Sequence, residues 1–124
     1  LGDVYKRQGS YFLNQLVGAA RARQMYFTAE VIKADEALRI GLVNRVVPYE
    51  QLEKAAADYA QELLALPTIA VGYMKKNLNT GLRSNLSDVL DSEAINMIRT
   101  FETEDHKGAA KAFVEKRPPQ FSGR

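Results

Sequence analysis

Residues 32–48 constrain the fold most, because within this short stretch the sequence pattern changes from helical to extended. The first part carries small and apolar side chains at helical spacing: Ala34, Ala37, Leu38 and Ile40. Gly41 follows at the position where a left-handed residue commonly ends a helix. Residues 42–47 are rich in β-branched side chains, and Pro48 has no amide to extend a ladder. The stretch predicts a short helix, a glycine stop and one short strand.

The rest of the chain predicts helices. A helical face over residues 12–17 ends at Gly18, and a second helix covers residues 20–28. Apolar residues at i, i+3 and i+4 spacing predict a helix over residues 52–64, and Pro67 suits the first turn of another that ends near Gly81. Asn85 with Asp88 resembles a capping box for a helix over residues 86–101. This part of the chain is therefore expected to be entirely helical.

The last predicted helix begins after Thr103, a good cap, and ends before Pro118 and Pro119. Its expected buried side is Ala109, Ala110, Phe113 and Val114. The tail over residues 120–124 has no periodicity and is expected to be loose unless Phe121 docks. Lys33 stands at the cap position of the helix that Gly41 ends, and lysine offers no acceptor to free amides.

The composition is that of an ordinary soluble domain: 124 residues, 46% hydrophobic and 26% charged. There is no cysteine and one histidine, so neither disulfides nor a thiolate or polyhistidine metal site is expected. No apolar run has the length of a membrane span. The net charge of +2 is spread over nearly equal numbers of bases and acids. That balance is weak support for nucleic-acid binding, with Lys75-Lys76 and Lys116-Arg117 as the local basic clusters.

Residues 1–8 do not fit the sequence that follows. Gly2 to Gln8 can be encoded by codons that look like a transposon adaptor used in sequencing libraries. The hypothesis is that residues 1–8 are a non-native segment and that the gene continues upstream. Native coding sequence across the Gln8–Gly9 junction would contradict it.

Residue chemistry alone indicates no reaction. Asp35-Glu36 and the acids from Glu102 to Asp105 lie near predicted helix starts, where the helix dipole favours carboxylates. Ser10 lacks a glycine elbow, His106 lies in a charged turn, and the dispersed glycines make no phosphate-binding loop. No catalytic and no metal-ligating residue is assigned.

Two ordered blocks carry a family resemblance over residues 9–124. The first contains Gly9-Ser10, then Leu13, Leu16, Val17 and Gly18, and the run Ala-Asp-Glu-Ala-Leu-Arg-Ile-Gly-Leu-Val-Asn-Arg-Val-Val-Pro at positions 34–48. The second contains Thr-Glu-Asp-His-Lys from Thr103, Ala-Phe-Val-Glu-Lys-Arg from Ala112, then Pro119 and Phe121. Together they resemble the second half of the crotonase superfamily, the enoyl-CoA hydratases and isomerases.

The resemblance implies an α/β fold, a crotonase-like ββα spiral followed by helices that assemble trimers. This chain would be mainly α-helical with one or two short strands. Residues 9–48 would end the spiral core, and residues 49–124 would form the C-terminal helical oligomerisation region. It also implies that the catalytic carboxylates and the oxyanion-hole amides precede Gly9, so the chain alone should be inactive.

The resemblance further implies ligand contacts for Phe113 and Lys116. In the family these positions touch coenzyme A, the Phe by packing and the Lys by facing phosphates. Against this, Phe113 could be ordinary helix core and Lys116 an ordinary solvated lysine. Met97 matches an aromatic contact and departs from it, and Ala29 replaces a glycine that is usual after Thr28.

The leading hypothesis is thus part of a cytoplasmic enoyl-CoA hydratase (a lyase) or enoyl-CoA isomerase of acyl-CoA and fatty acid metabolism. The expected ligand is an acyl-CoA thioester, with coenzyme A as part of the substrate and no separate cofactor, nucleic acid or membrane partner. The complete protein would be a homotrimer or a dimer of trimers. The alternative is a non-catalytic helical module for self-association and ligand covering. Acyl-chain specificity, and the choice between hydratase and isomerase, are not encoded in these residues.

Overall fold

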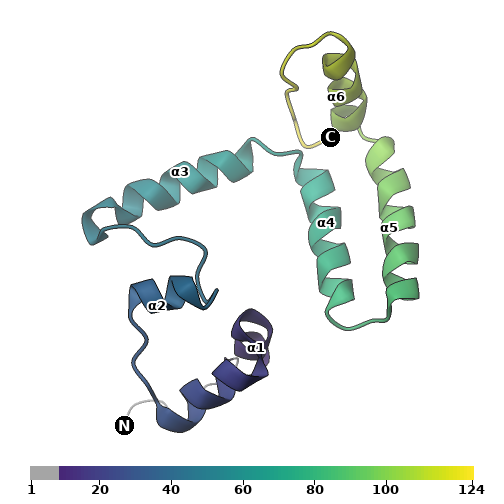
Figure 1. Ribbon diagram of the computed structural model, residues 1–124. Coiled ribbons are helices and arrows are strands. Elements are labelled where there is room, and N and C mark those ends of the chain that lie inside the picture. The colour runs from purple at the N-terminus through teal and green to yellow at the C-terminus, as the bar shows by residue number, and fades with distance from the viewer. Residues whose placement is uncertain (1–8) are drawn as a thin grey trace. The chain divides into compact units, whose positions relative to one another are not determined.

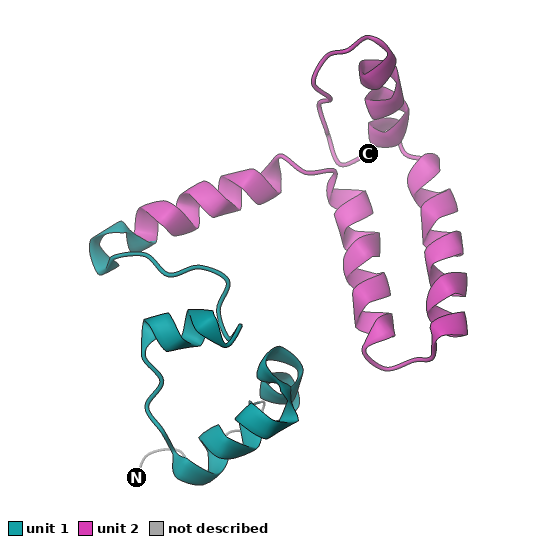
Figure 2. Ribbon diagram, in the orientation of Figure 1, with its two compact units in different colours: residues 1–52 teal, residues 53–124 magenta. Residues whose placement is uncertain are grey.

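The computed structural model describes residues 9–124, which are mainly helical (Figure 1). The chain divides into two compact units, Leu1–Leu52 and Glu53–Arg124 (Figure 2). The proposed non-native segment 1–8 lies outside the described residues.

The first unit contains α1 (Gly9–Thr28), α2 (Ala34–Arg39) and the 3-10 turn η1 (Tyr49–Gln51). Helix α1 bends at Gly18, whose φ of 78° and ψ of 160° are not helical, and the bend is visible in Figure 1. The predicted break between two helices at Gly18 is confirmed. Ala22 of α1 and Ala37 of α2 are buried.

The end of α2 confirms the predicted glycine stop. Gly41 has a φ of 75°. Its amide donates to the Leu38 carbonyl at 3.1 Å, and the Leu42 amide donates to the Ala37 carbonyl at 2.9 Å. This pair of bonds is a Schellman motif, in which the left-handed position is normally glycine. At the other end of α2, Lys33 makes no side-chain cap, as expected.

The predicted strand over residues 42–47 is wrong. Within residues 9–124 no strand is present, and these residues form turns and irregular backbone. β-Branched composition favours extended backbone, but a strand also requires a neighbouring segment to complete its ladder. Such a segment is not found in the described part of the chain, so the local preference remains without a sheet.

The second unit contains most of α3 (Leu52–Leu64) and all of α4 (Thr68–Gly81), α5 (Leu86–Phe101) and α6 (Glu104–Val114). Pro67 is the N-cap of α4, one position before its predicted place in the first turn. The Asn85 side chain accepts from the Asp88 amide at 3.1 Å, which confirms the predicted cap of α5. Helices α4 and α5 lie side by side (Figure 1).

A buried polar contact joins α4 to α5. Asn96 is 2% exposed, and its Nδ2 donates to Asn77 Oδ1 at 2.5 Å. Ser92 Oγ lies 3.0 Å from the same Asn77 oxygen. Because unpaired amides are costly to bury, this shared acceptor fixes how α4 and α5 face each other.

Helix α3 has the predicted amphipathic pattern, but none of its residues is buried. Its larger apolar side chains are Leu52, Tyr59, Leu63 and Leu64, all exposed. The pattern therefore predicted the helix correctly, while its apolar face has no cover within the described residues.

Candidate ligand site at the end of helix α6

Helix α6 positions the two predicted ligand contacts. Thr103 caps its start, because Thr103 Oγ1 accepts from the His106 amide at 3.1 Å, as predicted. The predicted buried face is wrong for three of its four residues: Ala110 is exposed, Phe113 is 85% exposed and Val114 80%, and only Ala109 is half-buried. Instead the inward face runs through Asp105 and Ala112, which are 4% and 0% exposed. The spacing of apolar side chains predicted the wrong buried face, because the buried face of α6 carries a small residue, Ala112, and a carboxylate, Asp105.

Lys116 follows Glu115, the C-cap of α6, in a left-handed turn with a φ of 54°. Its amide donates to the Phe113 carbonyl at 3.2 Å, and the Arg117 amide donates to the Ala112 carbonyl at 3.0 Å. These bonds form a second Schellman motif, now with lysine in the position that favours glycine. The Lys116 side chain thus leaves the chain at a fixed turn.

The charges around this turn leave the Lys116 ammonium available. Glu115 pairs instead with Arg117, at 2.6 Å from Nε, and with Lys111, at 3.8 Å. Among residues 9–124, no carboxylate lies within ion-pair distance of Lys116. An exposed aromatic ring and an unpaired ammonium at one helix end can pack against a planar group and attract an anion.

The C-terminal tail was expected to be loose unless Phe121 docks, and in the structure it is anchored. Phe121 is half-buried and lines a cavity of about 160 Å³ together with Pro67, Ile69, Thr100, His106 and Ala109. Beyond it, Asp105 Oδ1 accepts from the Ser122 amide at 2.7 Å and from Ser122 Oγ at 3.2 Å. Asp105 Oδ2 accepts from the Gly123 amide at 2.9 Å. The Asp105 amide in turn donates to the Arg124 carbonyl at 2.9 Å.

The sequence suggested only that the helix dipole favours a carboxylate at Asp105. The structure shows that Asp105 also binds the C-terminal tail. The bond from the Ser122 amide lowers the pKa of its carboxyl below the ordinary value of 3.8, although burial acts in the opposite direction. The sequence does not predict this role, because the donors lie in a tail without periodicity. Gly123, with a φ of 74°, is the one local signal of a specific backbone turn there.

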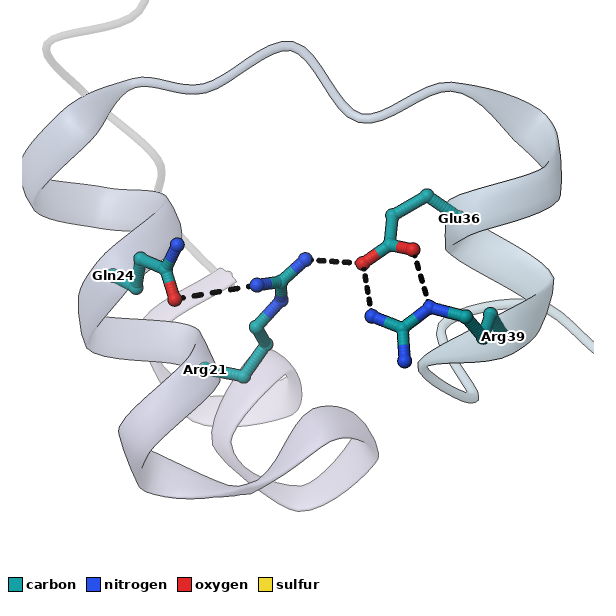
Figure 3. Close-up of polar contacts among 4 residues, drawn as sticks. All are labelled: Arg21, Gln24, Glu36 and Arg39. Carbon is teal, nitrogen blue, oxygen red and sulfur yellow. Dashed lines mark hydrogen bonds and ion pairs between the residues drawn. The ribbon is translucent and has the colours of Figure 1, made fainter.

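A polar cluster in the first unit contains Glu36, another of the acids expected near a helix start (Figure 3). Glu36 accepts from Arg39 of its own helix at 2.6 and 2.7 Å, and from the Arg21 guanidinium of α1. The hydrogen bond from Arg39 lowers the pKa of Glu36, with the positive charges of both arginines adding to it against the effect of burial. The cluster ties α2 to the second half of α1, so its role is structural.

An apolar groove of about 490 Å³ runs along the α4–α5 pair. Met97 stands where the family resemblance implies an aromatic side chain. It lines this groove and is 53% exposed. Phe113 and Lys116 do not line this groove. Within the described residues, no group of three or more His, Asp or Glu side chains could hold a metal ion. None of the helices described there combines the length and the apolar character of a membrane span.

Comparison with known proteins gives a consistent result. The family model for enoyl-CoA hydratase/isomerase matches residues 1–124. A short-chain-enoyl-CoA hydratase of Clostridium acetobutylicum is 42% identical over 88% of this chain and 42% of its own length. A crotonyl-CoA hydratase of Syntrophomonas wolfei is 39% identical over 91% of this chain and 44% of its own length.

Solved structures similar to this chain include enoyl-CoA hydratases as well. The crystal structure of an enoyl-CoA hydratase from Geobacillus kaustophilus superposes with a TM-score of 0.89 at 36% identity, covering 94% of this chain and 44% of that one. The chain thus spans less than half the length of these relatives. The family match extends over the entire sequence, and the chain belongs to the enoyl-CoA hydratase/isomerase family of the crotonase superfamily.

Proposed function

We propose that the complete gene product is an enoyl-CoA hydratase or isomerase that stabilises a thioester enolate in an oxyanion hole while carboxylates move protons. The observation that carries the proposal is the match of the whole chain to the family, with relatives named short-chain-enoyl-CoA and crotonyl-CoA hydratase. No catalytic residue is assigned within residues 9–124. The proposal includes a cytoplasmic location and no cofactor apart from the coenzyme A of the substrate.

The contribution proposed for this chain is coenzyme A binding by Phe113 and Lys116. Two observations support it. Phe113 is 85% exposed, so the described residues do not cover its ring. Lys116 occupies a left-handed position that favours glycine, and strained residues of this kind concentrate at functional sites. A lysine ammonium there would face phosphate groups, and the Phe113 ring would pack against the ligand.

The direct test of the site is the dissociation constant of coenzyme A in the complete protein. Replacing Lys116 by Ala should weaken binding by about 1.5 to 3 kcal/mol, the loss of a charge-assisted contact. That loss corresponds to roughly ten- to a hundredfold in affinity. Lys111→Ala, which removes an exposed lysine of α6 paired with Glu115, is the matched control and should change little. An unchanged constant for Lys116→Ala would remove Lys116 from the site.

The test of the reaction is turnover. The complete protein should act on crotonyl-CoA or on an enoyl-CoA with a shifted or conjugated double bond. A folded protein that turns over none of these acyl-CoA substrates would overturn the proposed activity. The 124-residue chain alone should be inactive in the same assays.

A second function is favoured by α3. Its exposed apolar side chains, such as Leu52 and Leu64, at 53% and 68%, form a face without cover in the described residues. On this alternative the chain is a non-catalytic module that self-associates through helices and covers a ligand. Within the leading proposal the same face would serve assembly into a homotrimer or a dimer of trimers. Sedimentation distinguishes the alternative, because a well-behaved monomer contradicts it.

Nucleic-acid binding through Lys75-Lys76 and Lys116-Arg117 is not part of the proposal. It would require steeply salt-dependent binding to DNA or RNA. We expect none, and such binding would reopen that hypothesis.

A further inference from the structure

The C-terminal tail returns to the start of the helix that it leaves (Figure 1). Helix α6 ends at Val114, the chain reverses at Lys116, and Ser122 and Gly123 bind Asp105 in the first turn of α6. We propose that Asp105 is a positioning residue for the coenzyme A contact, because its bonds to the tail hold the chain reversal that presents Lys116. This inference rests on the function proposed for Lys116.

The tail latch is the contact between Asp105 and the C-terminal tail. It uses both carboxylate oxygens of Asp105. Oδ1 accepts from the amide and hydroxyl of Ser122, and Oδ2 accepts from the Gly123 amide. Asp105 is 4% exposed, so a side chain without a second acceptor could not replace these bonds with water. Asparagine would direct an amide group at one of the donors. The latch therefore depends on a carboxylate.

Gly123 is required for the same latch. Its φ is 74°, and a Cβ atom placed on it would lie 2.9 Å from Thr68 Oγ1 of α4. A side chain at this position would meet both backbone strain and a steric clash. Gly123→Ala is therefore a second way to open the latch without changing any charge.

The latch and the Lys116 turn are the two ends of one strap, residues 115–123. Pro118 and Pro119 restrict φ in its middle, and Phe121 is half-buried where it lines the cavity beside α6. A lysine at φ 54° is disfavoured on its own, and such a conformation persists when the surrounding structure holds it from more than one side. Release of the tail end would let the Lys116 turn relax and spread the ammonium over many positions.

Hydrogen exchange of the 124-residue chain tests the latch independently of any ligand. Asp105→Asn and Gly123→Ala should each speed exchange of the Arg117 amide at least about tenfold, as well as that of Ser122. Glu104→Gln, which alters the neighbouring exposed acid and its pair with Lys107, is the control and should leave the Arg117 amide unchanged. Faster exchange at Ser122 with an unchanged Arg117 amide would overturn the coupling between the two ends.

Ligand binding to the complete protein tests the positioning role. Asp105→Asn should raise the dissociation constant of coenzyme A about five- to tenfold and leave that of pantetheine, which lacks the phosphates, unchanged. In a Lys116→Ala background, Asp105→Asn should add no further loss. Equal losses for both ligands, or the same added loss without Lys116, would overturn the inference and leave a general structural role.

Failure of the proposed function can be told apart from failure of the positioning role. If the unaltered protein does not bind coenzyme A, the proposed function of the site fails and positioning fails with it, while the exchange experiment still decides whether the latch holds the turn. If Asp105→Asn does not fold, Ser122→Ala replaces it, because that variant removes the hydroxyl bond at 3.2 Å and keeps both amide bonds. It should show the same pattern with a smaller amplitude.

Discussion

Lys116 and Gly41 occupy the same position in two copies of one helix-ending motif. Each follows a helix in the left-handed region, with φ of 54° and 75°, and each donates its amide to the carbonyl three residues earlier. In each case the next amide bonds to the carbonyl five residues before it, Leu42 to Ala37 and Arg117 to Ala112. The backbone requirement is therefore the same, but only one of the two positions carries the residue that meets it best.

Lys116→Gly should separate the stability of this turn from its function. Glycine removes the side-chain penalty of the left-handed conformation, so the free energy of unfolding should rise by about 0.5 to 1 kcal/mol. Coenzyme A affinity should fall as much as in Lys116→Ala, which keeps the penalty. Urea denaturation and ligand binding of both variants provide the measurements. A destabilised Lys116→Gly variant would show that the lysine side chain stabilises the turn.

Ala29→Gly should stabilise the first unit by about 0.5 to 1 kcal/mol. Ala29 has a φ of 51°, a left-handed conformation that disfavours a Cβ atom, and the family resemblance implies glycine at this position. Denaturant midpoints of the two proteins check the prediction. Ala20→Gly, inside the second half of α1, is the control and should be destabilising, since glycine is unfavourable in a helix interior.

The tail latch should weaken in acid. The folded-state pKa of Asp105 lies below its ordinary value of 3.8, so its contribution to stability is fully present above that pH and is lost as the pH falls through the lower folded value. The stability difference between the unaltered protein and Asp105→Asn should therefore be constant near neutrality and shrink below about pH 4. Urea denaturation from pH 6 to pH 3 measures it. A difference that grows on acidification would contradict the assignment.

Local signals in the sequence predicted most helices and their ends. Asn85, Thr103 and Gly41 act within a few residues of their own positions, so their roles follow from the neighbouring sequence. The strand over residues 42–47 failed because a strand depends on a partner that local preference cannot supply.

The difference between local signals and tertiary contacts also explains which residues of the candidate site could be predicted. Lys116 and Phe113 were named through family resemblance, and no periodicity indicated that Phe113 would be exposed. Asp105 was missed because its partners, Ser122 and Gly123, lie in an aperiodic tail whose return to α6 is a tertiary event. A buried carboxylate at a helix start has the same local sequence as a solvated one.

Asn85→Ala should cost α5 about 1 kcal/mol, the usual effect of losing an N-cap. The Asn85 side chain accepts from the Asp88 amide at 3.1 Å and also donates to the Asp88 carboxylate at 3.0 Å. Asn85→Asp retains the acceptor for the amide and is the control, although it places two carboxylates close together. Denaturation midpoints measure both variants. Equal stability of Asn85→Ala and the unaltered protein would mean that water replaces the cap without loss.

Glu36→Gln should destabilise the first unit, and the loss should depend on salt. Glu36 binds Arg39 within α2 and Arg21 on α1, so its charge supports a contact between two helices as well as a local one (Figure 3). Arg21 Nε is buried without a partner, which leaves that guanidinium dependent on its bonds to Glu36 and Gln24. Asp58→Asn breaks the exposed Lys54–Asp58 pair within α3 and is the matched control, because such surface pairs contribute little. Urea denaturation at low and high salt should show a larger loss for Glu36→Gln at low salt, and equal small losses for both variants would reduce the cluster to a surface ion pair.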